Sequence, residues 1–191
     1  MLLDSYDRER CQAADEDIGY STRATNFVSS REAADVRLRD AVLSLCSRAE
    51  FARRMVNTGR LSTPTVHDSP LSTPDEATFA GDAHLGAPAP DAPIRTRGGR
   101  DGFLLEQLGG AFDLLYVRDG AAPRTRDGIR LHVIGDDVID SGGLFAQRFD
   151  ATPGAAYLLR PDQHLCARWR RFDPAKVEAA RDRALGRHPH R

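Results

Sequence analysis

The stretch that decides the fold is Ala155–Leu185, which reads AAYLLRPDQHLCARWRRFDPAKVEAARDRAL. Residues 156–159 form a short apolar run, and residues 160–163 contain the proline and polar side chains of a tight turn. Residues 164–169 form a second run in which apolar and polar side chains alternate, as they do in a strand. The stretch therefore predicts a β-hairpin.

A helix is predicted to follow the hairpin. Asp173 is a favoured N-cap residue, Pro174 suits the first helical position, and Gly186 is a typical residue after a helix end. The residues between them carry one apolar stripe, formed by Val177, Ala180, Ala184 and Leu185. A hairpin closed by a terminal helix is expected to finish a small α/β domain.

Trp169 is predicted to anchor the hairpin on this helix. It alternates in phase with Leu165 and Ala167, so the three side chains are expected to share one face of the strand. The arginines around it predict a solvated strand edge and no nucleic-acid surface, because the formal net charge of the chain is only -1; they are Arg168, Arg170 and Arg171.

Residues 101–186 are predicted to form this α/β domain, with residues 187–191 as a tail. Before the hairpin, the expected elements are a helical turn at 103–108, strands at 112–117 and 129–134, an edge extension at 138–139 and a short helix at 144–149. The polar loop at residues 118–127 contains no cysteine.

Residues 1–59 predict two helices that pair as a hairpin, so the fold class expected for the whole chain is α+β. Residues 2–27 read as a helix without a strong apolar stripe. In the second helix, Ser29 and Glu32 have the spacing of a capping box, and apolar residues then recur at steps of three and four as far as Val56. Gly59 is expected to end that helix.

Residues 60–100 predict an extended arm between the two parts, lying across a neighbouring surface. Its prolines exclude a continuous helix or a central strand; they are Pro64, Pro70, Pro74, Pro88, Pro90 and Pro93. His67, Asp68 and Ser69 are adjacent in this arm, but three consecutive residues do not produce the geometry of a catalytic triad.

The composition excludes several classes of function. No run of 18 apolar residues predicts a membrane span, and the charged start MLLDSYDRER is unlike a secretory signal. The three widely spaced cysteines, Cys11, Cys46 and Cys166, predict reduced thiols and a cytoplasmic protein. Neither the glycine pairs nor the six histidines have the spacing of a phosphate or metal site. No catalytic, cofactor-binding or metal-ligating residue is therefore assigned.

Parts of the chain resemble the flavin-dependent aromatic hydroxylases, which include phenol, hydroxyphenylpropionate and polyketide hydroxylases. Residues 2–10, LLDSYDRER, are similar to a segment that follows the Gly-Asp flavin motif of that family. Residues 21–25 and 57–62 are similar to its helices, and residues 104–110 and 159–162 to its thioredoxin-like C-terminal domain. The resemblance covers nearly the whole chain but only the family's C-terminal third.

The resemblance implies a thioredoxin-like domain that lacks Cys-x-x-Cys. For the complete family enzyme it implies FAD, NAD(P)H and hydroxylation of an aromatic ring. The family's flavin and nicotinamide motifs have no counterpart in this sequence, so none of its catalytic residues is carried over. We expect this chain to be a structural or interaction module of such a monooxygenase. Its expected partner is a flavin-binding domain or subunit, and a homodimer of the chain is a further option that the resemblance allows.

The alternative is a stand-alone thioredoxin-like redox protein or a small-ligand-binding protein. A redox role requires a nucleophilic cysteine with a resolving partner near the first strand, and residues 117–130 contain none.

The start of the chain leads to one further expectation. Leu2, Leu3 and Tyr6 place apolar side chains at a terminus, where they need a partner to be ordered. The proline-rich arm is likewise expected to lack a surface within this chain. Either the polypeptide begins at an internal start of a longer hydroxylase gene, or it docks on a separate flavin subunit.

The purified chain is expected to retain no FAD. The backbone groups of a Gly-x-Gly-x-x-Gly turn, which would hold the pyrophosphate, are absent from its sequence. The absorbance spectrum after gel filtration checks this, and a yellow protein with retained flavin bands would contradict it.

Overall fold

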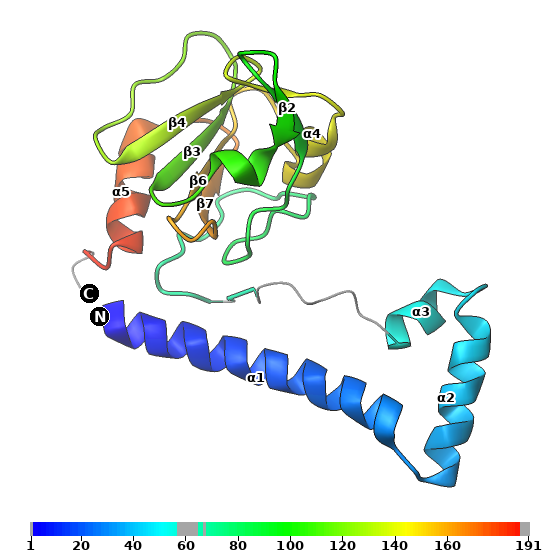
Figure 1. The fold of residues 1–191 in the computed structure, drawn as a ribbon. Coiled ribbons are helices and arrows are strands. Elements are labelled where there is room, and N and C mark those ends of the chain that lie inside the picture. The colour runs from blue at the N-terminus through cyan, green and yellow to red at the C-terminus, as the bar shows by residue number, and fades with distance from the viewer. Residues whose placement is uncertain (1, 57–64, 67, 188–191) are drawn as a thin grey trace. The chain divides into compact units, whose positions relative to one another are not determined.

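The computed structural model describes residues 2–56, 65–66 and 68–187, and the chain divides into two compact units (Figure 1). The sheet unit comprises residues 1–9 and 65–191, and the helical unit comprises residues 10–64. The predicted α+β class, with N-terminal helices followed by a sheet domain, is confirmed. The thioredoxin-like character of residues 101–186 stays a prediction.

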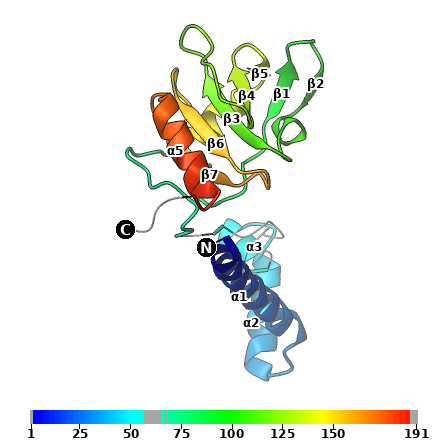
Figure 2. The ribbon, with the colours of Figure 1, turned by 90° about the vertical axis from the view of Figure 1, so that its left-hand side faces the viewer.

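The sheet unit is built on a seven-stranded mixed sheet with the order β2-β1-β5-β4-β3-β6-β7 (Figure 2). Its strands are β1 (Pro93–Thr96), β2 (Asp101–Phe103), β3 (Phe112–Val117), β4 (Ile129–Ile134), β5 (Val138–Asp140), β6 (Ala156–Leu159) and β7 (Leu165–Trp169). Strands β3 and β4 run parallel over their whole length, and β4 and β5 are also parallel. The other pairs are antiparallel. The predicted edge extension at 138–139 is thus an interior strand, because β1 pairs with its outer side.

The helices are α1 (Leu2–Ser29), α2 (Ala33–Leu45), α3 (Glu50–Val56), the 3-10 helix η1 (Leu104–Gln107), α4 (Leu144–Phe149) and α5 (Pro174–Ala184). The predicted helical turn at 103–108 therefore begins one residue late, because Phe103 ends β2. The Phe103 N–H, at the outer edge of the sheet, donates to the Glu106 carboxylate at 3.2 Å. A charged side chain at this position protects the edge strand from pairing with another chain.

Strand β3 is the centre of the sheet unit because both of its faces are buried. Its sequence FDLLYV has five buried residues, as expected for a strand covered on two sides. One face packs into a core with α4, η1 and residues 83–92, through residues such as Leu115 and Phe145. The other face packs into a core with α5, through residues such as Leu114 and Val177.

The predicted hairpin and terminal helix are present as expected (Figure 2). Strands β6 and β7 pair antiparallel across the turn. The Asp173 carboxylate caps α5 by accepting from the backbone N–H groups of Ala175 and Lys176, and Pro174 follows at the first helical position. Gly186 ends the helix region with a φ of 67°, which glycine adopts at little cost.

The predicted face of β7 is wrong for one residue. Ala167 pairs with Leu158, but Leu165 pairs with Leu159, so Cys166 is an extra residue in a β-bulge. Because side chains alternate along a strand, one extra residue reverses the face of everything before it. Leu165 therefore packs in the α4 core, whereas Ala167 and Trp169 pack in the α5 core.

The proline-rich arm lies along β7, within its own unit. Backbone hydrogen bonds join Thr73 N to Cys166 O and Gly86 N to Leu165 O, both at 2.8 Å, and Leu165 N to Ala87 O at 2.9 Å. Up to residue 92 the prolines prevent a regular strand, but the residues between them still supply single donors and acceptors. Residues 93–96 of the predicted arm instead form β1, which pairs on both sides because Pro93 is its first residue. The expectation that the arm lacks a surface within this chain is thus wrong for the described residues 65–66 and 68–92. The arm covers the exposed edge of β7.

The helical unit departs from its prediction at the helix ends. The single second helix is in fact α2 and α3, separated by a turn, and these two helices pack against each other. The predicted hairpin is wrong, because α1 and α2 do not pack along each other. The predicted capping box is wrong: the Ser29 hydroxyl donates to Thr25 O inside α1, and Glu32 is the N-cap of α2 with no side-chain bond. Serine can bond its own helix in this way and so does not cap the next one. Gly59 lies outside the described residues.

In the part of the chain that the structure describes, no helix is long and apolar enough to cross a membrane.

Replacing Trp169 by alanine is expected to reduce the free energy of unfolding of the sheet unit by about 3 kcal/mol or more. Trp169 is 5% exposed and packs between the sheet and α5, so its removal leaves a cavity. Chemical denaturation measures the change. The control is Phe103→Ala, since Phe103 is 51% exposed and should cost less than about 1 kcal/mol. Equal effects of the two substitutions would contradict the assigned packing.

Candidate functional site

Among the described residues, no group of three or more His, Cys, Asp or Glu side chains is placed to hold a metal ion. His67 lies outside the described residues, and the Ser69 hydroxyl donates to the Glu9 carboxylate at 2.5 Å. Ser69 is therefore committed to a structural contact.

The predicted solvated edge around Trp169 is wrong for Arg168 and Arg170, whereas Arg171 is exposed as predicted. Arg168 is buried, its guanidinium binds the Asp75 carboxylate at 2.6 to 3.2 Å, and it donates to Ala83 O at 2.6 Å. The ring of Phe79 lies 4.3 Å from the Arg168 guanidinium and 4.0 Å from that of Arg170. The arm provides Asp75, Phe79 and Ala83, so these arginines fasten it to the sheet. Sequence patterning missed this because the partners are about 90 residues away.

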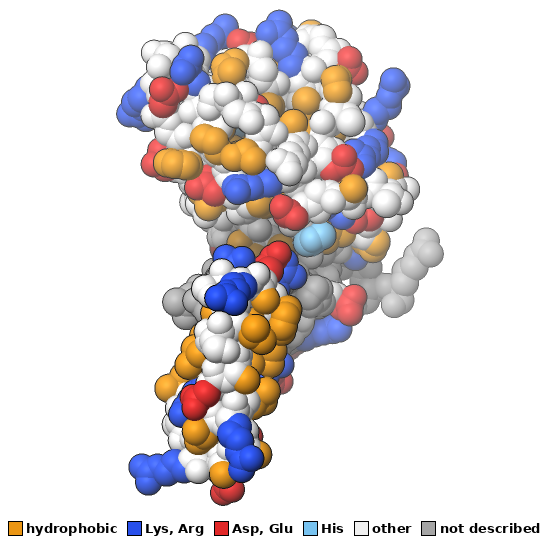
Figure 3. Space-filling model, turned by 90° about the vertical axis from the view of Figure 1, so that its right-hand side faces the viewer, with side chains coloured by type: hydrophobic (Ala, Val, Ile, Leu, Met, Phe, Trp, Pro, Cys, Tyr) orange, Lys and Arg blue, Asp and Glu red, His pale blue; other side chains and the backbone are white. Residues whose placement is uncertain are grey.

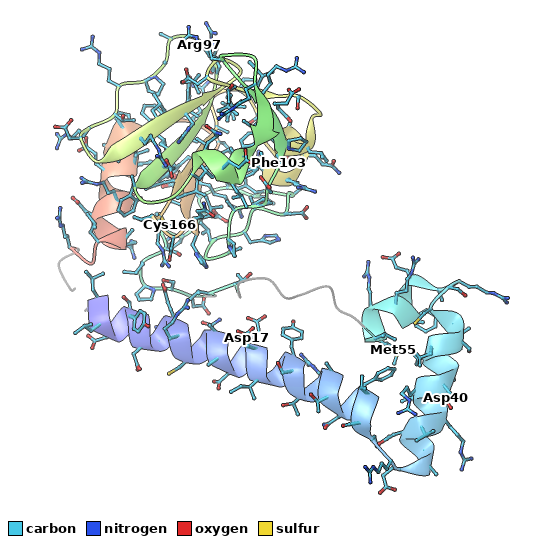
Figure 4. The ribbon with its side chains drawn as sticks, in the orientation of Figure 1. Asp17, Asp40, Met55, Arg97, Phe103 and Cys166 are labelled. Carbon is cyan, nitrogen blue, oxygen red and sulfur yellow. The ribbon has the colours of Figure 1, made fainter. Side chains whose placement is uncertain are left out.

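The three cysteines differ in exposure: Cys11 is exposed, Cys46 is half-buried and Cys166 is buried. The loop at residues 118–128 joins the parallel strands β3 and β4 without a helix and without a cysteine. Cys166 is fully buried in the α5 core, and burial raises the pKa of its thiol to about 12 (Figure 4). A thiol with so high a pKa is a poor nucleophile at neutral pH. Cys46 is half-buried and its thiol donates to Val42 O.

Asp113 on β3 is a buried carboxylate with a complete set of partners. Arg130 donates to it at 2.6 and 3.0 Å, Gly109 N donates at 2.8 Å, and His132 Nε2 lies 2.8 Å from it. Burial alone would raise the pKa of Asp113, but the hydrogen bonds from His132, Arg130 and Gly109 outweigh it and lower the pKa. The cluster joins β3, β4 and the turn after η1, which is a structural role.

A second buried charge network holds the start of α1 on the sheet unit. We call it the Arg160 clamp; it consists of Glu9, Ser69, Arg160 and Asp162. The Arg160 guanidinium donates to both oxygens of Glu9, at 2.8 and 3.1 Å, and to both oxygens of Asp162, at 3.1 and 2.6 Å. Arg160 is 8% exposed and Glu9 is 5% exposed. Bidentate pairs of this kind are strong and geometrically specific.

The clamp keeps Glu9 and Arg160 charged although both are buried, whereas Asp162 is exposed. Burial would raise the pKa of Glu9, but hydrogen bonds from Arg160 and Ser69 outweigh it and lower the pKa. Burial would likewise raise the pKa of Asp162, and its contacts with His164 and Arg160 lower it strongly. The clamp also joins two segments that carry the family resemblance, LLDSYDRER and Leu159–Asp162. Apart from the resemblance of both segments to the same family, no sequence pattern indicated that Glu9 and Arg160 would be in contact.

The exposed apolar residues concentrate on α1, α2 and α3. Of the twelve large hydrophobic residues that are exposed among those described, ten lie in these helices; they are Leu2, Leu3, Tyr6, Ile18, Val28, Leu38, Leu43, Leu45, Phe51 and Met55. Figure 3 shows hydrophobic side chains gathered along the surface of the helical unit, and Figure 4 labels Met55 on α3. We call these ten residues the apolar helical set. A concentration of this kind is typical of a surface that binds another protein.

Helix α1 has the reverse of the usual amphipathic pattern. Its buried positions are Ser5, Glu9 and Ala13, whereas the much larger Leu3 is 82% exposed and Ile18 is 63% exposed. A helix of a self-sufficient domain places its large apolar residues toward the core. The arrangement in α1 therefore leaves large apolar side chains exposed to solvent.

Neither a protein-family model nor a curated protein sequence matches the chain. The solved structures that are similar in fold include the following three. K252c-soaked RebC is 21% identical with a TM-score of 0.62, and the match covers 98% of this chain and 36% of that chain. Aklavinone-11 hydroxylase, solved as a ternary complex with FAD and aklavinone, is 18% identical with a TM-score of 0.56. That match covers 97% of this chain and 35% of the hydroxylase chain.

The flavin-dependent monooxygenase PieE, solved with FAD and substrate, is 20% identical with a TM-score of 0.56, over 85% of this chain and 31% of that chain. The chain therefore spans about a third of the length of the structures that it matches. Its fold is that of the C-terminal part of FAD-dependent monooxygenases, as the resemblance in the sequence predicted.

Replacing Glu9 by glutamine is expected to destabilise the sheet unit by about 3 kcal/mol at pH 7, because Arg160 loses its buried countercharge. The pKa of Glu9 is lowered on folding, so its contribution is present above the unfolded pKa and is lost as the pH falls through the folded pKa. The difference between the variant and the wild type should therefore narrow below about pH 4.

Denaturation curves at several pH values measure this difference. The matched control is Glu178→Gln, since the Arg126–Glu178 pair lies at the surface and should contribute about 0.5 kcal/mol or less. A pH-independent effect of Glu9→Gln would contradict the charged clamp.

Proposed function

We propose that this chain is the C-terminal interaction module of an FAD-dependent aromatic monooxygenase, and that α1, α2 and α3 dock on the flavin-binding part of that enzyme. The flavin-binding part is either a segment of the same gene product or a separate subunit. The observation that carries the proposal is the apolar helical set, in a chain whose fold matches only about a third of three flavin enzymes.

The extent of the similarity supports this assignment. The matches to RebC and aklavinone-11 hydroxylase cover 97 to 98% of this chain, so they include the helices as well as the sheet unit. In those proteins the corresponding helices belong to a much longer chain. A neighbouring domain of that kind would cover apolar side chains that lie exposed here.

In the complete enzyme, FAD and NAD(P)H would supply the redox chemistry of ring hydroxylation. This chain would contribute a rigid sheet unit and the start of α1, held by the Arg160 clamp. The thiols of Cys46 and Cys166 donate to backbone carbonyls, and neither has a second cysteine beside it in sequence, which favours the interaction module over a stand-alone redox protein.

The proposal is tested by reading the gene of this chain and its neighbours for a flavin-binding segment, and by co-expressing that segment with the chain. We expect the two to elute together with bound FAD. The variant Phe51→Asp/Met55→Asp should weaken the complex at least about tenfold, because the two exposed apolar side chains would become charged.

Phe103→Asp is the matched control, since Phe103 has similar exposure but lies on the sheet unit. It should leave the affinity unchanged. The proposal is refuted if the flavin-binding polypeptide does not bind this chain. It is also refuted if neither the gene nor its neighbours encode such a polypeptide.

A further inference from the structure

We propose that the helical unit folds only when it docks on its partner, and that the first turns of α1 template this folding. The inference rests on the proposed function, which supplies the partner: the flavin-binding part of the enzyme. The helices of the structure are then the docked form of residues 10–56.

The first argument is the interior of the helical unit. Among its described residues, only three are buried, and all are small or medium in size: Ala13, Val42 and Ala52. Both hydrophobic cores of the molecule lie in the sheet unit. Apolar burial is the main force that opposes the conformational entropy of a chain. Three such side chains cannot balance the ordering of more than forty residues.

The second argument concerns the helices themselves. Helix α2 has 13 residues and α3 has 7, which is too short for stable isolated helices in water. Glu32 caps α2 without a side-chain hydrogen bond, and neither α1 nor α2 has a basic residue in its last turn. Local stabilisation therefore does not replace the missing core.

The start of α1 differs because it belongs to the sheet unit. Glu9 is held by Arg160 and Ser69, and the Ser5 hydroxyl donates to Leu2 O at 2.9 Å. Nucleation is the costly step of helix formation, whereas each further residue adds one hydrogen bond. The clamp therefore provides a preformed nucleus from which α1 can extend when the partner arrives.

Gly19 marks where this extension should fail in the absence of a partner. Glycine in a helix interior is less favourable than alanine, and a Cβ atom added at Gly19 would meet nothing within 4 Å. The substitution Gly19→Ala is therefore sterically free. It should strengthen α1 beyond this residue in the isolated chain.

Amide hydrogen exchange on the purified monomeric chain tests the inference. We expect slow exchange in β3 and β6, protection at residues 5–9, and a decline along α1 toward Ser29. Residues 33–56 should exchange within about tenfold of the rate of an unstructured chain. Gly19→Ala should extend protection past residue 19, whereas Glu9→Gln should remove it from α1 and leave β3 protected. Glu178→Gln should change neither.

Adding the flavin-binding polypeptide should slow exchange in residues 33–56 at least about a hundredfold. If these residues are as well protected as β3 in the free monomer, the inference is wrong while the proposed docking still stands. If the flavin-binding polypeptide gives no protection, both the inference and the proposed function fail. Protection that rises with the concentration of the chain alone would assign the surface to a second copy and refute the chosen partner.

Discussion

The burial of both faces of β3 is the constraint on which the sheet unit depends. A strand with the sequence FDLLYV leaves apolar side chains on each side, so each side needs a cover. Helix α5 covers one face, and α4 with residues of the arm covers the other. The arm is therefore part of the domain core, and Arg168 of β7, which binds Asp75 and Phe79, holds it in place.

The helical part of the chain is organised in a different way. Its large apolar side chains face outward, and its few buried residues are mostly alanine. The start of α1 belongs to the sheet unit and is held there by charged groups: the Arg160 guanidinium donates to the buried Glu9 carboxylate and to Asp162. A buried pair of this type has little net effect on stability compared with an apolar contact, but it fixes geometry.

The similarity to RebC, PieE and aklavinone-11 hydroxylase bears on this difference between the sheet unit and the helices. The matched region is about a third of each of those chains, and ten of the twelve exposed large hydrophobic residues among those described lie on α1, α2 and α3. In the sheet unit the buried apolar residues form two cores.

Local patterns in the sequence determined most of the sheet unit: strands β3, β4 and β6, helices α4 and α5, the cap at Asp173 and the end at Gly186. These features depend on residues within a few positions of one another, where periodicity and capping rules apply. Tertiary structure alone decided the bulge at Cys166, the pairing of β1 and β2, the path of the arm along β7, and the contact of Glu9 with Arg160. Each of these depends on partners far apart in the chain, and no local pattern records which distant group satisfies a given donor, charge or strand edge.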